Sequence, residues 1–368
     1  MKIAHIIFKT FDFGGGIETT MKEIGPRLVG MGHEIVVYTM SHYGAQPSSY
    51  QGMKIKPMWA IPTKSAEKLT SSLLATLDVC FKEKPDLVHY HSFTHQTTFL
   101  PRSFGIPVLI TGQGLEWKRS RWNKFGSSFL KLSEKIMVRS ASSISVVSRV
   151  QQNYLKEKYD RESTYIPQGV NKPEIFKPDD ITRMWGLKGR DYILTAVRLV
   201  QEKGVHYLIE AFKGMKTDLK LVIAGDAAHE KAYLQKLKDL AGDNPNIIFT
   251  GYVTGKLYGE LRSNPYAFVL ASEIEGLPTV LLEAMSYGNC CVASDIPENL
   301  EALRGKGLSF KNKTPEDLRD RLTELAQDPQ KAAHYRSTST EGMEEFYWDK
   351  IAREYNDLYV QMARKPGL

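Results

Sequence analysis

The sequence predicts an α/β fold built from two parallel β-sheets that follow one another along the chain. In both halves, short apolar runs of strand length alternate with segments whose apolar residues recur at helical spacing. The length of 368 residues suits two domains of ordinary size. Near the middle, the stretch 166–178 carries three prolines and one glycine, which break both patterns and indicate an interdomain linker.

The first half opens with a predicted strand at 3–8, a glycine turn and then a helix that ends at Gly32. One face of that helix is apolar and carries Ile17, Met21, Ile24 and Leu28. Further strands are expected at 35–39, 86–90, 108–111 and 143–147. Such a string of strand–helix units forms a parallel sheet covered by helices.

The second half repeats this organisation, with strands expected at 192–197, 220–224, 247–250, 267–270 and 290–293. Helices are expected between them, for example at 205–212 and 278–287. Open parallel sheets bind ligands at the carboxyl ends of their strands. The sequence therefore predicts two Rossmann-like domains with parallel sheets facing across a cleft.

Composition and charge limit the class of protein and its partners. The net charge is +7, and the excess lies in residues 1–170, which hold 22 Lys and Arg against 13 Asp and Glu. This favours an anionic partner for the first half. No zinc-ligand spacing, helix-turn-helix pattern or aromatic ribonucleoprotein motif supports a nucleic acid. The apolar run at 3–8 is too short for a signal peptide or a membrane span, so we expect a cytoplasmic protein.

A glycine turn, Gly14-Gly15-Gly16, joins the first strand to its helix. Glycines let a phosphate approach the backbone, and the helix N-terminus offers N–H donors and a positive partial charge. A tight turn with no ligand explains the same three residues equally well.

Two cations, Arg198 and Lys203, follow the strand predicted at 192–197, and Gly204 comes directly after them. Fixed cations at a carboxyl strand end suit a leaving diphosphate, whose negative charge grows in the transition state. A solvated, charged loop is the alternative interpretation.

The segment from Glu275 to Glu283 is the most specific feature. Pro278 suits the first position of a helix, which places Glu275 before the helix and Glu283 inside it. Eight residues at helical rise span about 12 Å, roughly the distance from a donor sugar to the ribose across a diphosphate. Carboxylates accept hydrogen bonds from vicinal hydroxyls, and the N–H groups of Leu277 and Thr279 are expected to face the phosphates. A capping carboxylate plus a surface glutamate is the alternative, although Glu283 has apolar neighbours and needs a partner.

These motifs together resemble the retaining glycosyltransferases of family 4, over nearly the whole chain and in the expected order. The segments that carry the resemblance are 14–18, 85–91, 166–170, 198–204, 221–226, 275–288 and 294–298. The resemblance implies a hexosyltransferase that moves a sugar from a nucleotide diphosphate sugar to a glycan or lipid-linked acceptor, in polysaccharide or glycolipid biosynthesis.

The resemblance also implies an arrangement of domains and site residues. An acceptor-side domain would comprise residues 1–170 and a C-terminal helix within 345–368 that crosses back to it. Residues 171–344 would bind the nucleotide sugar. Arg198 and Lys203 would bind the diphosphate, Glu275 the donor sugar and Glu283 the ribose. Gly276, Leu277, Pro278 and Thr279 would line the donor site, which Gly15 and Gly16 would approach from the first domain.

One residue departs from the family pattern, because Gln113 stands where the family often has a histidine that contacts the donor sugar. Glutamine can donate or accept a hydrogen bond but cannot act as a base. His91 and His95, near another strand end, are candidates for the acceptor pocket or ordinary buried histidines. No Asp-x-Asp occurs in the sequence, so we expect a metal-independent enzyme without a cofactor.

Two other functions fit parts of the sequence. A nucleotide-sugar epimerase shares the architecture but needs no acceptor, whereas a non-enzymatic binder of anionic polymers leaves Glu275 and Glu283 unexplained.

Residues 115–139 interleave cations with aromatic residues, which suits the surface of an anionic membrane and predicts peripheral attachment to its inner face. Alternatively, Phe125, Phe129, Leu132 and Ile136 form one apolar stripe that packs on the sheet.

Overall fold

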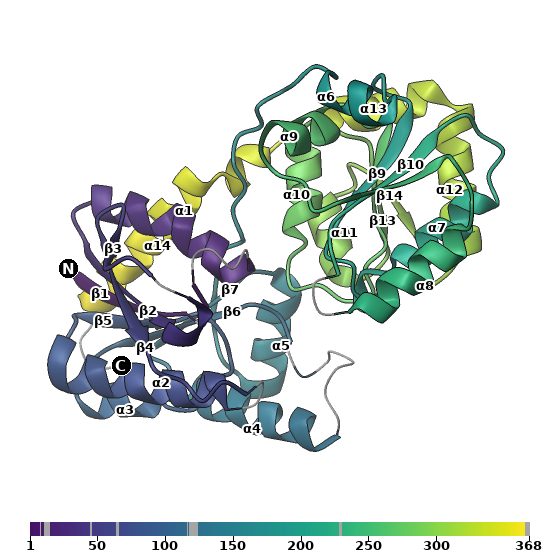
Figure 1. Cartoon of the computed structure of the whole chain (residues 1–368). Coiled ribbons are helices and arrows are strands. Elements are labelled where there is room, and N and C mark those ends of the chain that lie inside the picture. Colours follow the sequence, from purple (N-terminus) through teal and green to yellow (C-terminus); the bar gives the residue numbers. More distant parts are fainter. Residues whose placement is uncertain are drawn as a thin grey trace. The chain divides into compact units, whose positions relative to one another are not determined.

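A computed structural model describes residues 1–7, 9–10, 15–44, 46–63, 66–115, 117, 124–227 and 230–364. The chain divides into two compact α/β units (Figure 1). Unit 1 comprises Met1–Gly169 and the stretch that begins at Trp348, and unit 2 comprises Val170–Tyr347. No helix within the described ranges is long and apolar enough to cross a membrane.

Unit 1 contains one sheet in the order β3-β4-β2-β1-β5-β6-β7-β8. The pairings are parallel except that β3 runs antiparallel to β4. Its elements in chain order are β1 Lys2–Ile6, α1 Gly16–Gly30, β2 Glu34–Met40, η2 Ser41–Tyr43, β3 Ser49–Tyr50, β4 Met53–Met58, α2 Glu67–Asp78, η3 Val79–Glu83, β5 Leu87–Tyr90, α3 Phe99–Ser103, β6 Val108–Gly112, α4 Lys124–Ser140, β7 Ser143–Val146, α5 Arg149–Tyr159, β8 Thr164–Tyr165 and α14 Trp348–Ala363.

Unit 2 contains a wholly parallel sheet in the order β11-β10-β9-β12-β13-β14. Its elements are α6 Asp180–Trp185, β9 Tyr192–Ala196, η5 Gln201–Lys203, α7 Val205–Lys213, β10 Lys220–Ala224, α8 Lys231–Ala241, β11 Ile247–Gly251, α9 Gly255–Ser263, β12 Ala267–Leu270, α10 Thr279–Ser286, β13 Cys291–Ser294, α11 Pro297–Leu303, β14 Leu308–Phe310, α12 Pro315–Gln327, α13 Pro329–Thr338 and η6 Met343–Phe346.

Helices cover both faces of the unit 1 sheet. Successive strand residues point to opposite sides, so neighbouring residues belong to different cores. Ile3 packs with α1 and α14, whereas the next residue, Ala4, packs with α2, η3, α4 and α5. The C-terminal helix α14 contributes a buried apolar face to the first of these cores: Trp348, Ile351, Ala352, Tyr355, Leu358, Tyr359 and Met362. The prediction that the last helix returns to the first domain is therefore confirmed.

Helix α4 differs from the sequence expectation. Its buried residues are Leu130, Ser133, Glu134, Met137 and Val138. Phe129 and Leu132 are 47% and 56% exposed, so the interpretation that they pack on the sheet is wrong. The buried Glu134 explains the difference, because its carboxylate accepts hydrogen bonds from Trp117, Tyr154 and Tyr159 and pairs with Lys158. Phe125 and residues 118–123 lie outside the part of the chain whose side chains are described.

Candidate functional site

In unit 2, the turn between β9 and α7 lies directly against the end of β12. Gly204 makes this approach possible, since it has φ +64° and a Cβ there would lie 2.0 Å from the carbonyl oxygen of Ala271. The N–H of Glu273 donates to the carbonyl of Glu202 at 2.8 Å, which ties the loop after β12 to the same turn. The carboxyl ends of two neighbouring strands are thus held together.

This contact brings together two of the predicted site residues. Lys203 Nζ lies 2.5 Å from Glu275 Oε1, and the two side chains are only 14% and 10% exposed. Arg198 lies on the same turn but is exposed, and within the described residues it forms no ion pair. Lys203 is therefore neutralised by Glu275, the residue that is predicted to bind the sugar, whereas Arg198 remains available to an anion.

Helix α10 begins at Thr279, one residue later than expected, and Pro278 is its N-cap with φ −77° and ψ 83°. The N–H of Thr279 donates to the carbonyl of Leu277 at 2.9 Å, so it is not the free phosphate donor that the sequence suggested. The N–H of Leu277 makes no hydrogen bond within the described residues. Gly276 lies in the half-buried loop before the helix.

Glu283, on the second turn of α10, has the partner that its surroundings require. Arg262 on α9 places Nη1 3.4 Å from Glu283 Oε2. Burial raises the pKa of Glu283, and the nearby Arg262 charge opposes that rise. Arg262 was not predicted as a site residue, because nothing in its local spacing connects it to Glu283.

In unit 1, Gly15 is the N-cap of α1, and a Cβ there would lie 2.1 Å from Glu18 Oε2. The buried Glu18 carboxylate also accepts a hydrogen bond from the N–H of Lys9 at 3.1 Å. The helix N-terminus therefore already holds an anionic group beside Gly15 and Gly16, which disfavours a phosphate at this point. Gly14 lies outside the described residues.

Gln113 follows β6 and belongs to a chain of hydrogen bonds. Gln168 Nε2 donates to Gln113 Oε1 at 2.5 Å, and Thr20 Oγ1 donates to Gln168 Oε1 at 2.5 Å. Gln113 Nε2 is buried and has no partner within the described residues. A buried amide donor without a partner is suited to a ligand hydroxyl. In the sequence, Gln168 is marked only by its place in the motif at 166–170.

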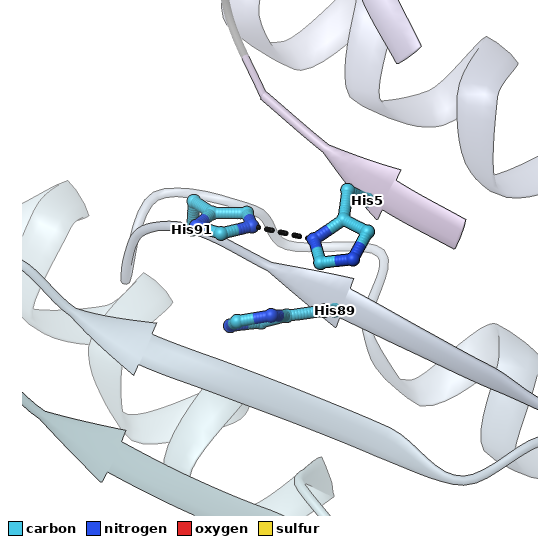
Figure 2. A group of neighbouring side chains, drawn as sticks. All are labelled: His5, His89 and His91. Atoms are coloured by element: carbon cyan, nitrogen blue, oxygen red, sulfur yellow. Dashed lines mark hydrogen bonds between the residues drawn. The ribbon is translucent and has the colours of Figure 1, made fainter. Parts of the chain in front are cut away.

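The histidines near β5 are completely buried. His91 Nε2 and His5 Nδ1 share a hydrogen bond of 3.0 Å, and His89 stacks on His91 with 4.0 Å between ring centroids (Figure 2). Burial lowers the pKa of His91 to about 3 and those of His5, His89 and His95 well below their usual range. His95 Nδ1 bonds Ser72 Oγ at 2.8 Å. Neither His91 nor His95 reaches the surface.

Two groups of described side chains have the spacing of metal ligands. In the first group, both ring nitrogens of His89 are already bonded, to Tyr359 and Thr111, and its stacking on His91 keeps their lone pairs from converging. In the second group, Lys256 lies within 3.3 Å of Asp179, Asp180 and Glu260 and supplies the positive charge. In the second group the charges are therefore balanced by protein groups, whereas in the first group His5 Nε2 and His91 Nδ1 are buried without a hydrogen-bond partner among the described residues.

Two family models match most of the chain. The model described as Glycosyltransferase Family 4 matches residues 14–172, and that described as Glycosyl transferases group 1 matches residues 179–341. A putative teichuronic acid biosynthesis glycosyltransferase of Bacillus subtilis is 26% identical over 287 residues, which cover 74% of this chain and 69% of that protein. An alpha-maltose-1-phosphate synthase of Mycobacterium tuberculosis is 25% identical over 291 residues, covering 71% and 74%.

Solved structures share the fold. Sucrose-phosphate synthase from Thermosynechococcus elongatus superposes with a TM-score of 0.85 at 19% identity and covers 98% of this chain and 99% of that one. The HepE protein of Anabaena, in complex with UDP, gives a TM-score of 0.81 at 16% identity, with coverage of 98% and 100%.

Proposed function

The chain belongs to the family 4 glycosyltransferases of the GT-B fold, and we propose that it transfers a hexosyl unit from a nucleotide diphosphate sugar with retention of configuration. The observation that carries the proposal is the convergence of Lys203, Glu275 and Gly204 at the carboxyl edge of the unit 2 sheet. The UDP bound to the HepE protein supports a nucleotide donor. The names of the relatives support a role in polysaccharide biosynthesis.

The chemistry follows from the charges on these residues. Arg198 and Lys203 neutralise the diphosphate as its bond to the sugar breaks, Glu275 holds the sugar and Glu283 the ribose. The acceptor hydroxyl attacks the anomeric carbon from the face that the diphosphate leaves, and its proton passes to a phosphate oxygen. Because Arg198 is exposed and Lys203 can exchange Glu275 for the diphosphate, we propose that transfer needs no divalent ion, and turnover should survive EDTA.

Transfer assays with Arg198→Ala and Lys203→Ala test the proposal. Each loses a charge-assisted contact to the leaving group, so turnover at saturating donor should fall by roughly 10- to 100-fold. Lys213→Ala is the matched control, because Lys213 is an exposed lysine at the end of α7. Normal turnover in both site variants would refute the assignment. Before these assays, thermal stabilisation of the protein by UDP, GDP and ADP would identify the nucleotide base of the donor.

We further propose that unit 1 docks on an anionic membrane, where a lipid-linked acceptor is presented. Helices α2, α3 and α4 run along one side of the unit (Figure 1), and the π-helix η3, which continues α2, contacts α3. They expose eight large apolar side chains: Leu69, Leu73, Leu74, Phe81, Phe99, Phe104, Phe129 and Leu132. We call these elements the docking layer. Exposed apolar groups in this number mark an interaction surface.

The charge of the docking layer specifies the partner. Its exposed cations are Lys82, Lys84, Arg102, Lys131, Lys135 and Arg139. Among the described residues between 66 and 140, Asp86 is the one exposed carboxylate. Apolar groups between cations suit the headgroup region of a bilayer that contains acidic lipids. This surface extends the segment 115–139 that the sequence indicated.

Co-sedimentation with vesicles of phosphatidylcholine, with and without phosphatidylglycerol, tests the docking layer. Binding should require the acidic lipid and weaken with salt. Lys131→Glu with Lys135→Glu should cost at least about 2 kcal/mol, or roughly 30-fold in partitioning. Lys236→Glu with Lys238→Glu, on exposed positions of α8, changes the net charge equally and should bind normally. If the protein does not bind vesicles that contain phosphatidylglycerol at low salt, the docking proposal is wrong and a soluble glycan is the better acceptor.

A further inference from the structure

Helices α9 and α10 are joined by an arginine held between two aromatic rings. The guanidinium carbon of Arg262 lies 4.1 Å from the ring centroid of Tyr258 and 4.7 Å from that of Tyr287. Tyr258 and Arg262 are four residues apart on α9, and Glu283 is four residues before Tyr287, which caps α10. Each pair therefore shares one helical face, and the two faces meet at the guanidinium.

The backbone at Arg262 is fixed as well. The fully buried Asn289, after α10, donates from Nδ2 to the carbonyl oxygen of Arg262 at 2.9 Å. The Arg262 side chain is 20% exposed, so its position is set by the two rings and by Glu283. A planar guanidinium between two rings has few other rotamers open to it.

The same guanidinium engages one oxygen of the carboxylate. Arg262 Nη1 lies 3.4 Å from Glu283 Oε2, and Glu283 Oε1 has no hydrogen-bond partner within the described residues. The Glu283 side chain is 33% exposed, which leaves the second oxygen accessible. No other cation among the described residues lies within 4.0 Å of this carboxylate.

We propose that Arg262 is the positioning residue for Glu283: it holds Oε2 and so leaves Oε1 to accept hydrogen bonds from the vicinal hydroxyls of a ribose. The inference rests on the proposed ribose role of Glu283. Arg262 itself touches the carboxylate and the two rings, and acts on the nucleotide only through Glu283. Burial raises the pKa of Glu283, so loss of Arg262 should favour its protonated form.

Calorimetry with free nucleoside diphosphate, over a pH range from 6 to 9, tests the inference. Arg262→Met keeps the length of the side chain but removes its charge. Its affinity should be about 10-fold weaker than wild type at pH 7, and its deficit relative to wild type should grow as the pH falls and shrink as the pH rises. Arg336→Met is the matched control, since Arg336 also lies over a tyrosine ring and bonds a backbone carbonyl but pairs with no carboxylate in the part of the chain that the structure describes.

The Glu283→Gln background separates a positioning role from a structural one. There, Arg262→Met should cause no further loss, whereas a role in helix packing alone would weaken binding in both backgrounds. If the methionine variant fails to fold, Arg262→Lys is tested in its place. It retains the charge and should therefore keep the wild-type pH profile. Unchanged affinity of Arg262→Met at every pH would overturn the inference. Unchanged affinity of Glu283→Gln would instead refute the ribose role on which it rests.

Discussion

Lys203 and Glu275 neutralise each other at 2.5 Å, although the proposed mechanism assigns them to different parts of the donor. When a donor binds, the ammonium must turn to the diphosphate and the carboxylate to a sugar hydroxyl. Both exchanges replace one charge-assisted hydrogen bond by another, so their net cost is small. The ion pair therefore orients both groups before the donor arrives.

This exchange makes a prediction for Glu275→Gln. Removing the carboxylate charge frees Lys203 for the diphosphate, so the variant should bind free nucleoside diphosphate at least as tightly as the wild-type enzyme. Its turnover should fall by about 10-fold or more, because the sugar loses a charged acceptor. Calorimetry and a transfer assay measure the two effects separately. Parallel losses of nucleotide affinity and turnover would contradict these roles, and Glu283→Gln is the contrasting variant that should lose nucleotide affinity.

Among the secondary-structure elements, the turn between β9 and α7 depends on one glycine. Gly204→Ala combines a left-handed backbone with a Cβ 2.0 Å from a carbonyl oxygen. We expect the free energy of unfolding of unit 2 to fall by at least about 3 kcal/mol. Gly186→Ala is the control, because Gly186 has the same left-handed conformation (φ +63°, ψ +31°) but its added carbon would meet only the end of the Lys220 side chain at 3.5 Å, so it should cost only about 1 kcal/mol. Equal losses in urea titrations of the two variants would show that the close approach is unimportant.

The sequence predicted those elements whose patterns are local. Every strand expected in either half is present within two residues of its bounds, apart from Phe8, which lies outside the described residues. The strands β3, β8 and β14 span only two or three residues, too few for a pattern to emerge. The strand β4, Met-Lys-Ile-Lys-Pro-Met, was not predicted either, because it is half-buried at the margin of the sheet and contains Pro57.

The site contacts were beyond sequence reasoning for a different reason. Lys203 meets Glu275 across 72 positions, and Arg262 meets Glu283 across 21, so no helical or strand period links either pair. Local patterns identified the individual residues Lys203, Glu275 and Glu283 but not their partners. The face of α4 was misjudged for the same reason, because the groups that bond the buried Glu134 come from elsewhere in the chain.

In the whole molecule, the two units differ in their content of buried, neutral histidine. Unit 1 contains His5, His89, His91 and His95, all completely buried with lowered pKa values, and His91 falls to about 3. Among the described residues of unit 2, His206 has a pKa lowered by burial. The four side chains of unit 1 bridge β1, β5 and α2, so that their neutral state is part of how the sheet and its cover pack.

This difference predicts that acid unfolds unit 1 before unit 2. An unfolded histidine binds a proton near pH 6.5, whereas these folded histidines do not, so the unfolded state gains protons as the pH falls below that value. The stabilisation is present above about pH 6.5 and is lost towards the folded pKa values, by about 1.4 kcal/mol per pH unit for each histidine. Four such groups can remove the whole stability of an ordinary domain within about two pH units.

Hydrogen exchange between pH 7.5 and 5, read separately on peptides of each unit, measures the effect. Protection in unit 1 should collapse at a higher pH than protection in unit 2. His91→Gln removes one titrating group, so the slope of unit 1 stability against pH should fall by one proton whatever the variant does to stability at neutral pH. His334→Gln, at an exposed position of α13, should leave both slopes unchanged. Equal acid sensitivity of the two units, or a slope unaffected by His91→Gln, would show that the buried histidines do not govern acid unfolding.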